Sequence, residues 1–225
     1  MEKQITALVV QERKPQRVNV YLDGEFAFGL SRITAAWLSV GRKLTDREIG
    51  KLLTEDEVEV AYQRALHYLS FRPRSKPEVI QNLKNKGFSD SIIETTLERL
   101  EEQNFVDDRS FADQWIENRN TFHPRSRRLL SAELRQKGIT DQTIQNALED
   151  VSIPEEELAY KAAFSRAQRY RSLDWIAFKT KVGAFLARRG FSYSVSAPVL
   201  KRLWEDTGLS TKSDYDEFIN GVDEK

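Results

Sequence analysis

The sequence predicts a mainly α-helical fold in which three tandem three-helix repeats form an elongated, curved rod behind a small N-terminal piece with three strands. The first observation is an internal repeat anchored on Gly87, Gly138 and Gly190, at spacings of 51 and 52 residues. The second is the helical spacing of the apolar residues in each copy. A three-helix unit of about 50 residues is small, so neighbouring units are expected to pack edge to edge.

The N-terminal piece has a different pattern. Its apolar, β-forming runs lie at 5–12, 17–22 and 25–30. Asp23-Gly24 joins the last two as a two-residue hairpin turn. Helices are predicted near 31–39 and 46–53, the second beginning with a capping box of Thr45 and Glu48. Three strands alone are marginally stable, so this piece is expected to pack on the first helical unit.

Five apolar columns are kept in all three copies. They are Val79, Leu130 and Val182; Leu83, Leu134 and Leu186; Phe88, Ile139 and Phe191; Leu97, Leu148 and Leu200; and Leu100, Val151 and Leu203. Each anchoring glycine follows the last apolar position of a helix and is preceded by Lys or Arg. This arrangement is typical of a glycine just past a helix C-terminus, with favourable charge on the last turn.

The helix starts carry capping residues. Ser75 and Glu78 form a capping box around Pro77, and Ser126 can cap without the reciprocal Glu. Ser89, Thr140 and Ser192 stand where the third helix of each copy needs a cap, and Asp107 or Asp108 fits a cap better than a catalytic group. The predicted helices are 55–70, 76–86 and 90–103; 108–121, 127–137 and 141–150; and 155–171, 175–189 and 193–206.

These boundaries divide the chain into five parts. They are an N-terminal extension at 1–54, repeats at 55–106, 107–154 and 155–206, and an acidic tail at 207–225 with a weak helical stretch near 213–220. The third repeat departs from the others, because Phe178 stands where the first two have Ser75 and Ser126. The start of its second helix is therefore less well defined by the sequence.

The composition argues against an enzyme. The chain has no Cys, only two His, and no glycine-rich phosphate loop, so we expect no catalytic residues, metal or cofactor. It has no apolar run long enough to cross a bilayer and no signal-peptide pattern at the N-terminus. A monomeric protein of the reducing cytoplasm is expected.

The net charge is zero, but the basic residues gather on the second helix of each repeat and the segment before it. We expect the partner-binding residues to be Arg72, Arg74, Lys76, Lys84 and Lys86; Arg125, Arg127, Arg128, Arg135 and Lys137; and Lys179, Lys181, Arg188 and Arg189. A simpler interpretation is a solvated helix face whose bases form ion pairs with acids of the adjacent helix. The tandem spacing favours one continuous basic surface that faces an elongated, acidic partner.

Such a partner is either DNA or a protein filament. Three-helix units with a basic second or third helix resemble helix-turn-helix DNA readers, but the usual short glycine turn is missing. The aromatic residues fall in the apolar columns, so a base-stacking platform is not predicted.

Three stretches of the sequence together resemble the RecX family of bacterial recombination regulators. They are YLSFRPRSKPEVIQNLKNKGF at 68–88, LERLEEQNFVDDRSFADQWIENR at 97–119 and HPRSRRLLSAELRQKGI at 123–139. The resemblance covers about residues 58–206 and is weaker in the third repeat, while the strand-containing N-terminus looks like an extension found in part of the family. It implies a non-enzymatic protein of DNA repair and the SOS response.

In that family the implied activity is binding to the RecA recombinase filament on single-stranded DNA. Such binding would inhibit ATP hydrolysis, strand exchange and coprotease activity. The alternative is a helical DNA-binding module that acts alone, such as a transcription regulator, and direct contact with single- or double-stranded DNA is compatible with both.

Overall fold

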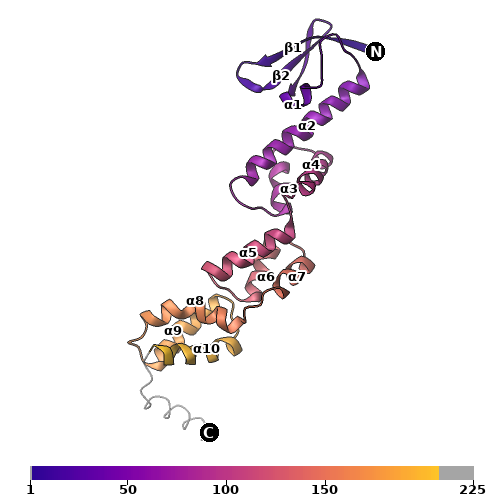
Figure 1. The fold of residues 1–225 in the computed structure, drawn as a ribbon. Coiled ribbons are helices and arrows are strands. Elements are labelled where there is room, and N and C mark those ends of the chain that lie inside the picture. The colour runs from indigo at the N-terminus through magenta and orange to yellow at the C-terminus, as the bar shows by residue number, and fades with distance from the viewer. Residues whose placement is uncertain (1, 208–225) are drawn as a thin grey trace. The chain divides into compact units, whose positions relative to one another are not determined.

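The computed structural model describes residues 2–207 and divides the chain into two compact units, residues 1–107 and 108–225. Unit 1 holds a sheet and the first helical repeat, and unit 2 holds the second and third repeats (Figure 1). The predicted rod concerns the placement of the units, so it stays a prediction. The predicted helical stretch near 213–220 lies outside the described residues.

The sheet of unit 1 has four antiparallel strands in the order β3-β2-β1-β4. These are β1 (Glu2–Gln11), β2 (Lys14–Leu22), β3 (Glu25–Ser31) and β4 (Lys43–Thr45). The predicted turn at Asp23-Gly24 is confirmed, with both residues at positive φ. The prediction of three strands was wrong, because β4 adds a short edge beside residues 2–4. Three residues of β4 are too few to produce a periodic pattern.

The helices after the sheet also differ from the prediction. The helix expected over 31–39 is only α1 (Arg32–Ala35), because the chain then turns back through Gly41, at φ 94°, into β4. The helices expected at 46–53 and 55–70 are one continuous helix, α2 (Asp46–Leu69), which crosses the predicted boundary after residue 54. No glycine-proline break separates the two segments, so nothing stops helix propagation there.

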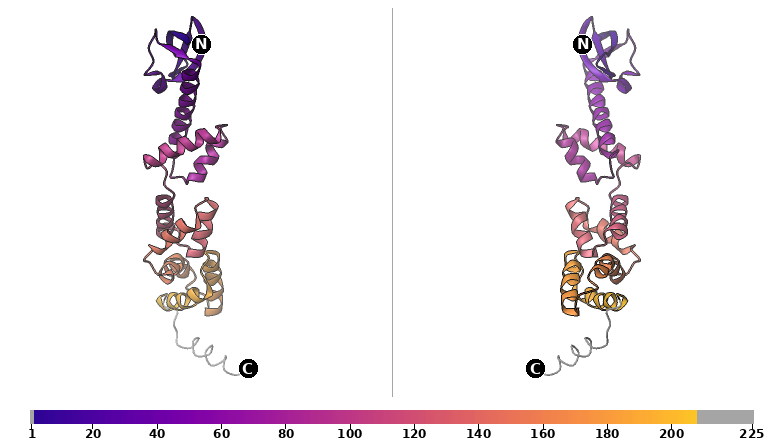
Figure 2. Two further views of the ribbon diagram at one scale, coloured as in Figure 1. Left: turned by 90° about the vertical axis from the view of Figure 1, so that its right-hand side faces the viewer. Right: turned by 90° about the vertical axis from the view of Figure 1, so that its left-hand side faces the viewer.

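The capping box that starts α2 is confirmed. Thr45 Oγ1 accepts from the Glu48 N–H, and the Glu48 carboxylate accepts from the Thr45 N–H at 2.8 Å. These bonds to the Thr45 backbone and side chain, with the nearby Arg42, lower the pKa of Glu48. The other end of α2 packs in the first repeat, so this helix connects the sheet to the repeat (Figure 2).

The first repeat consists of the end of α2, α3 (Lys76–Lys84) and α4 (Asp90–Glu102). The capping box of Ser75 and Glu78 is confirmed. Ser89 stands at the start of α4 as predicted, but its side chain makes no cap hydrogen bond; its Oγ lies 3.2 Å from Ser91 Oγ instead. Gly87 ends the α3 turn at φ 86°, as expected for a glycine past a helix C-terminus.

Unit 2 contains two further three-helix repeats. Their helices are α5 (Asp108–Phe122), α6 (Arg127–Gln136), α7 (Asp141–Glu149), α8 (Glu155–Arg169), α9 (Trp175–Arg188) and α10 (Tyr193–Asp206). The predicted caps Ser126, Thr140 and Ser192 are confirmed. In the third repeat Asp174 caps α9, so this helix starts one turn before Phe178, which is fully buried.

The second and third repeats touch where the start of α6 meets the end of α9. The Ser126 N–H donates to the Arg189 carbonyl at 3.0 Å. A Cβ placed on Gly190 would lie 2.4 Å from Ser126 Oγ and 2.8 Å from Leu129 Cβ. Gly190 is therefore required both by its φ of 87° and by the close approach of the next repeat.

Candidate partner-binding surface

Five of the predicted partner-binding residues form ion pairs inside their own repeat. These pairs are Arg72–Glu78 at 2.9 Å, Lys76–Glu101 at 2.5 Å, Lys84–Asp90 at 2.8 Å, Arg135–Asp141 at 2.6 Å, and Arg125–Glu133. The Lys84 and Arg135 pairs occupy equivalent positions in the first two repeats, three residues before and after the glycine. For these bases the interpretation as a salt-bridged helix face describes the geometry.

Three other predicted residues are exposed and have no ion pair within the described part of the chain. They are Lys86, Arg128 and Arg188, one in each repeat. Each lies on the second helix of its repeat or next to its end. A base without a carboxylate partner keeps its full charge available to an anion, so these residues are the best candidates for an intermolecular contact.

The remaining predicted residues are held by aromatic rings or backbone groups. Arg74 lies 4.0 Å from the Tyr68 ring centroid, and the side chains of Lys137, Lys181 and Arg189 lie near Trp115, Tyr170 and Phe185. The Arg127 N–H donates to Glu155 and its guanidinium donates to the Val151 carbonyl at 3.0 Å. Lys179 lines a shallow groove between α9 and α10. Cation–π contact fixes these charges without neutralising them.

A cluster of arginines in unit 2 shares one carboxylate. Glu133 accepts from Arg119 Nε at 3.0 Å and from Trp115 Nε1 at 2.8 Å, and it also pairs with Arg125. Burial lowers the pKa of Arg125, and the positive charges of Arg119 and Arg189 lower it further. Three cations around one anion leave an excess of positive charge at the contact between the second and third repeats. Arg119 was not predicted, because its proximity to Arg189 depends on tertiary packing.

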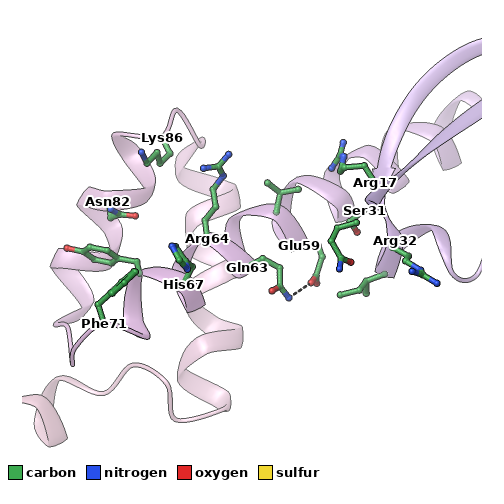
Figure 3. A pocket seen from close by; sticks show the side chains of 14 residues that line it. Arg17, Ser31, Arg32, Glu59, Gln63, Arg64, His67, Phe71, Asn82 and Lys86 are labelled. Atoms are coloured by element: carbon green, nitrogen blue, oxygen red, sulfur yellow. Dashed lines mark hydrogen bonds between the residues drawn. The ribbon is translucent and has the colours of Figure 1, made fainter. Parts of the chain in front are cut away.

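Unit 1 carries an open groove of about 770 Å³ between the sheet and the first repeat (Figure 3). On the sheet side Arg17 is neutralised by Asp56 at 2.9 Å, and in the middle Glu59 pairs with Arg99 at 2.7 Å. The bases that line the groove without an ion pair among residues 2–207 are Arg32, Arg64 and Lys86. The groove is therefore electropositive. Sequence reasoning missed it because its walls come from segments far apart in the chain.

Two exposed phenylalanines correct the prediction that no aromatic platform exists. Phe71 is 70% exposed and Phe122 is 67% exposed, although the aromatic residues were assigned to apolar columns. They occupy the same place in the first two repeats, sixteen residues before the glycine, in the stretches FRPRS and FHPRS. The repeated Phe-x-Pro-Arg-Ser motif was visible in the sequence, but its exposure was not.

The structure adds no catalytic or membrane feature within residues 2–207. No group of His, Asp and Glu side chains in this range is arranged to hold a metal ion. Likewise, none of the helices described has the length and apolarity needed to span a membrane.

Comparison with protein families gives four matches that together cover most of the chain. They are "Regulatory protein RecX N-terminal domain" at residues 3–45 and the first, second and third RecX three-helix domains at 61–100, 107–148 and 154–200. The family boundaries place a three-helix domain on each repeat.

Individual relatives agree. The Regulatory protein RecX of Leuconostoc mesenteroides is 31% identical over 89% of this chain and 76% of its own length. That of Bacillus licheniformis is 32% identical, with coverages of 88% and 76%. A crystal structure of regulatory protein RecX aligns with a TM-score of 0.69 at 30% identity, covering 88% of this chain and 98% of the other. With this fold, these repeats and these relatives, the chain belongs to the RecX family of regulatory proteins.

Proposed function

We propose that this protein is a non-enzymatic regulator that binds the RecA recombinase filament on single-stranded DNA and inhibits its ATP hydrolysis, strand exchange and coprotease activity in the cytoplasm. The observation that carries the proposal is the presence of one exposed, unpaired base in each repeat, at Lys86, Arg128 and Arg188, within the described chain. Family membership supports the same partner.

The arrangement suits a long, repetitive and acidic partner. Each unpaired base contributes a modest attraction by itself, because exposed charges are screened by salt. Several such contacts on one chain add up, since the second and third contacts form at a high effective concentration. A filament that repeats its surface along an axis can supply the matching anions for all three repeats.

The direct test compares recombinase-coated single strands with bare DNA. We expect the protein to bind coated strands far more tightly than bare single strands or duplex, and to slow ATP hydrolysis by the coated strands. The measurement is fluorescence anisotropy of a labelled oligonucleotide with and without recombinase, together with a coupled ATPase assay. Equal or tighter binding to bare duplex, with sequence preference and a steep salt dependence, would instead support a DNA-binding module that acts alone.

A further inference from the structure

We infer that Phe71 and Phe122 are stacking platforms through which the first two repeats bind a single-stranded nucleic acid directly. The inference adds a strand contact to the proposed function. Its test uses bare oligonucleotide without recombinase, so its failure would leave the filament proposal standing.

The two rings are exposed for no reason internal to the fold. Phe71 follows the end of α2 and Phe122 is the last residue of α5, and both precede the segment that leads to the capping serine of the next helix. Large apolar side chains at equivalent positions of two repeats would be expected in the core, as Val79 and Leu130 are. Their shared exposure instead indicates a shared external contact.

The surroundings of Phe71 favour an anion. The ring lies 5.0 Å from the His67 ring in an edge-to-face contact, which holds it beside the groove of unit 1 (Figure 3). Arg64 and Lys86 line the same groove and have no ion pair among the described residues. Asn82 adds an amide with both donor and acceptor groups, which can read the edge of an unpaired base.

The surroundings of Phe122 are also basic. The ring stands three residues from both Arg119 and Arg125, which share the single carboxylate of Glu133. The charge of Arg189 adds to this group. The second copy therefore repeats the combination of an exposed ring with excess positive charge, although its bases come from different positions.

A single-stranded nucleic acid fits this combination better than an acidic peptide. Every nucleotide carries a phosphate and a base with a flat face, so identical ring-and-cation units can bind successive parts of one strand. A duplex buries the faces of its bases and cannot stack on the rings. An acidic peptide would contact the bases and use each Phe only as an apolar surface, a role that Leu also fulfils.

The experiment separates stacking from apolar contact. In the full chain, the double variant Phe71→Leu/Phe122→Leu is expected to bind a fluorescein-labelled oligothymidine about tenfold or more weakly, since base–aromatic stacking is commonly worth this much for each base. The slope of log affinity against log salt concentration should not change, because no phosphate contact is lost. The double variant Phe71→Trp/Phe122→Trp should retain binding. The matched control is Phe26→Leu, a ring that is 59% exposed beside Glu25 in the hairpin and should have no effect.

A second pair of variants tests the cations. Arg64→Gln/Lys86→Gln should lower the salt slope by about 2, one unit for each lost phosphate contact. Three results would overturn the inference: no binding of bare single strands by the parent protein, unchanged affinity in the Leu double variant, or equal losses in the Leu and Trp variants. Weaker binding of a poly-glutamate peptide by the Leu double variant, with oligothymidine binding unchanged, would assign the rings to an acidic protein. Urea unfolding of each variant shows whether the fold is intact.

Discussion

The segments before α3 and α6 carry nearly the same residues but lie in different surroundings. Ser75 and Ser126 both cap their helices and are both buried, and Arg74 and Arg125 precede them at equivalent positions. In the first repeat Arg74 packs on a tyrosine ring beside an open groove. In the second repeat Arg125 pairs with Glu133 beneath the end of α9.

This difference shows that local sequence sets the local structure, whereas the neighbouring repeat sets which charges remain available. The position of Glu133 is held by Asn82 in the first repeat, so no carboxylate neutralises Arg74 there. The third repeat closes the second helix start with its own backbone through Arg189 and Gly190. The same motif therefore stabilises the contact between two repeats at one place and leaves bases exposed at the other.

The largest effect is expected at the glycines. Gly190→Ala forces a Cβ into a left-handed conformation and onto Ser126 Oγ, so it should lower the free energy of unfolding by about 3 kcal/mol or more. Gly87→Ala has the same φ but meets nothing within 4 Å, so we expect a loss of only about 1 to 2 kcal/mol. Urea unfolding followed by circular dichroism measures both, and equal losses would show that the contact with Ser126 does not matter.

The next effect is expected at the shared carboxylate. Glu133→Gln removes the only acid that pairs with Arg119 and Arg125 in the described chain, so unfolding should become easier by about 2 kcal/mol. Asn82→Ala, at the equivalent position of the first repeat, should change stability by less than about 0.5 kcal/mol because its side chain only lines the groove. The comparison fails if thermal unfolding shows that both variants lose the same stability.

A smaller and more even effect is expected at the caps. Ser75→Ala and Ser126→Ala each remove a hydrogen bond to a backbone N–H in the first turn, which typically costs about 1 kcal/mol. Since both caps have the same geometry, the two losses should agree within about 0.5 kcal/mol. Chemical denaturation of the single variants checks this. A much larger loss for Ser126→Ala would mean that the contact with the third repeat depends on the hydroxyl as well as on the backbone.

The smallest effect is expected at the repeated surface ion pairs. Lys84→Gln and Arg135→Gln break the pairs with Asp90 and Asp141, which are exposed, and each should change the unfolding free energy by less than about 1 kcal/mol. The change should shrink further in 0.5 M salt, because screening weakens exposed pairs. Melting curves at low and high salt give the answer, and a large, salt-independent loss would indicate that these pairs hold the helices together.

The repeats and their helix boundaries could be predicted because local chemistry encodes them. Serine caps, a proline in the first turn and a glycine at positive φ act within a few residues, and they locate α3, α6 and α7 closely. The apolar columns work for the same reason. Val79, Leu83 and Leu100 and their counterparts mark the buried face by spacing alone.

The features that the sequence missed depend on contacts between distant segments. The strand β4 exists because it pairs with the start of β1, and three residues carry too little pattern to reveal it. The groove of unit 1 joins residues near 17 and 32 to residues between 59 and 86. The exposure of Phe71 and Phe122 was missed because an aromatic residue next to a helix end looks the same in sequence whether or not the core receives it.

The most direct test of the central claim reverses one unpaired base in each repeat. The variant Lys86→Glu/Arg128→Glu/Arg188→Glu should keep the melting temperature of the parent protein, since the described structure gives these side chains no ion pair to lose. Its inhibition of ATP hydrolysis by recombinase-coated single strands should fall by at least an order of magnitude, which needs a loss of only about 1.4 kcal/mol. Single reversals should be mild, because the contact is multivalent.

The matched control is Arg13→Glu/Lys14→Glu/Arg47→Glu, which changes the net charge equally at exposed positions outside the repeats and should inhibit as the parent does. The account predicts a folded triple variant with weak inhibition beside a fully active control. A folded Lys86→Glu/Arg128→Glu/Arg188→Glu variant that still inhibits normally would contradict it, and so would an equal loss of inhibition in the control.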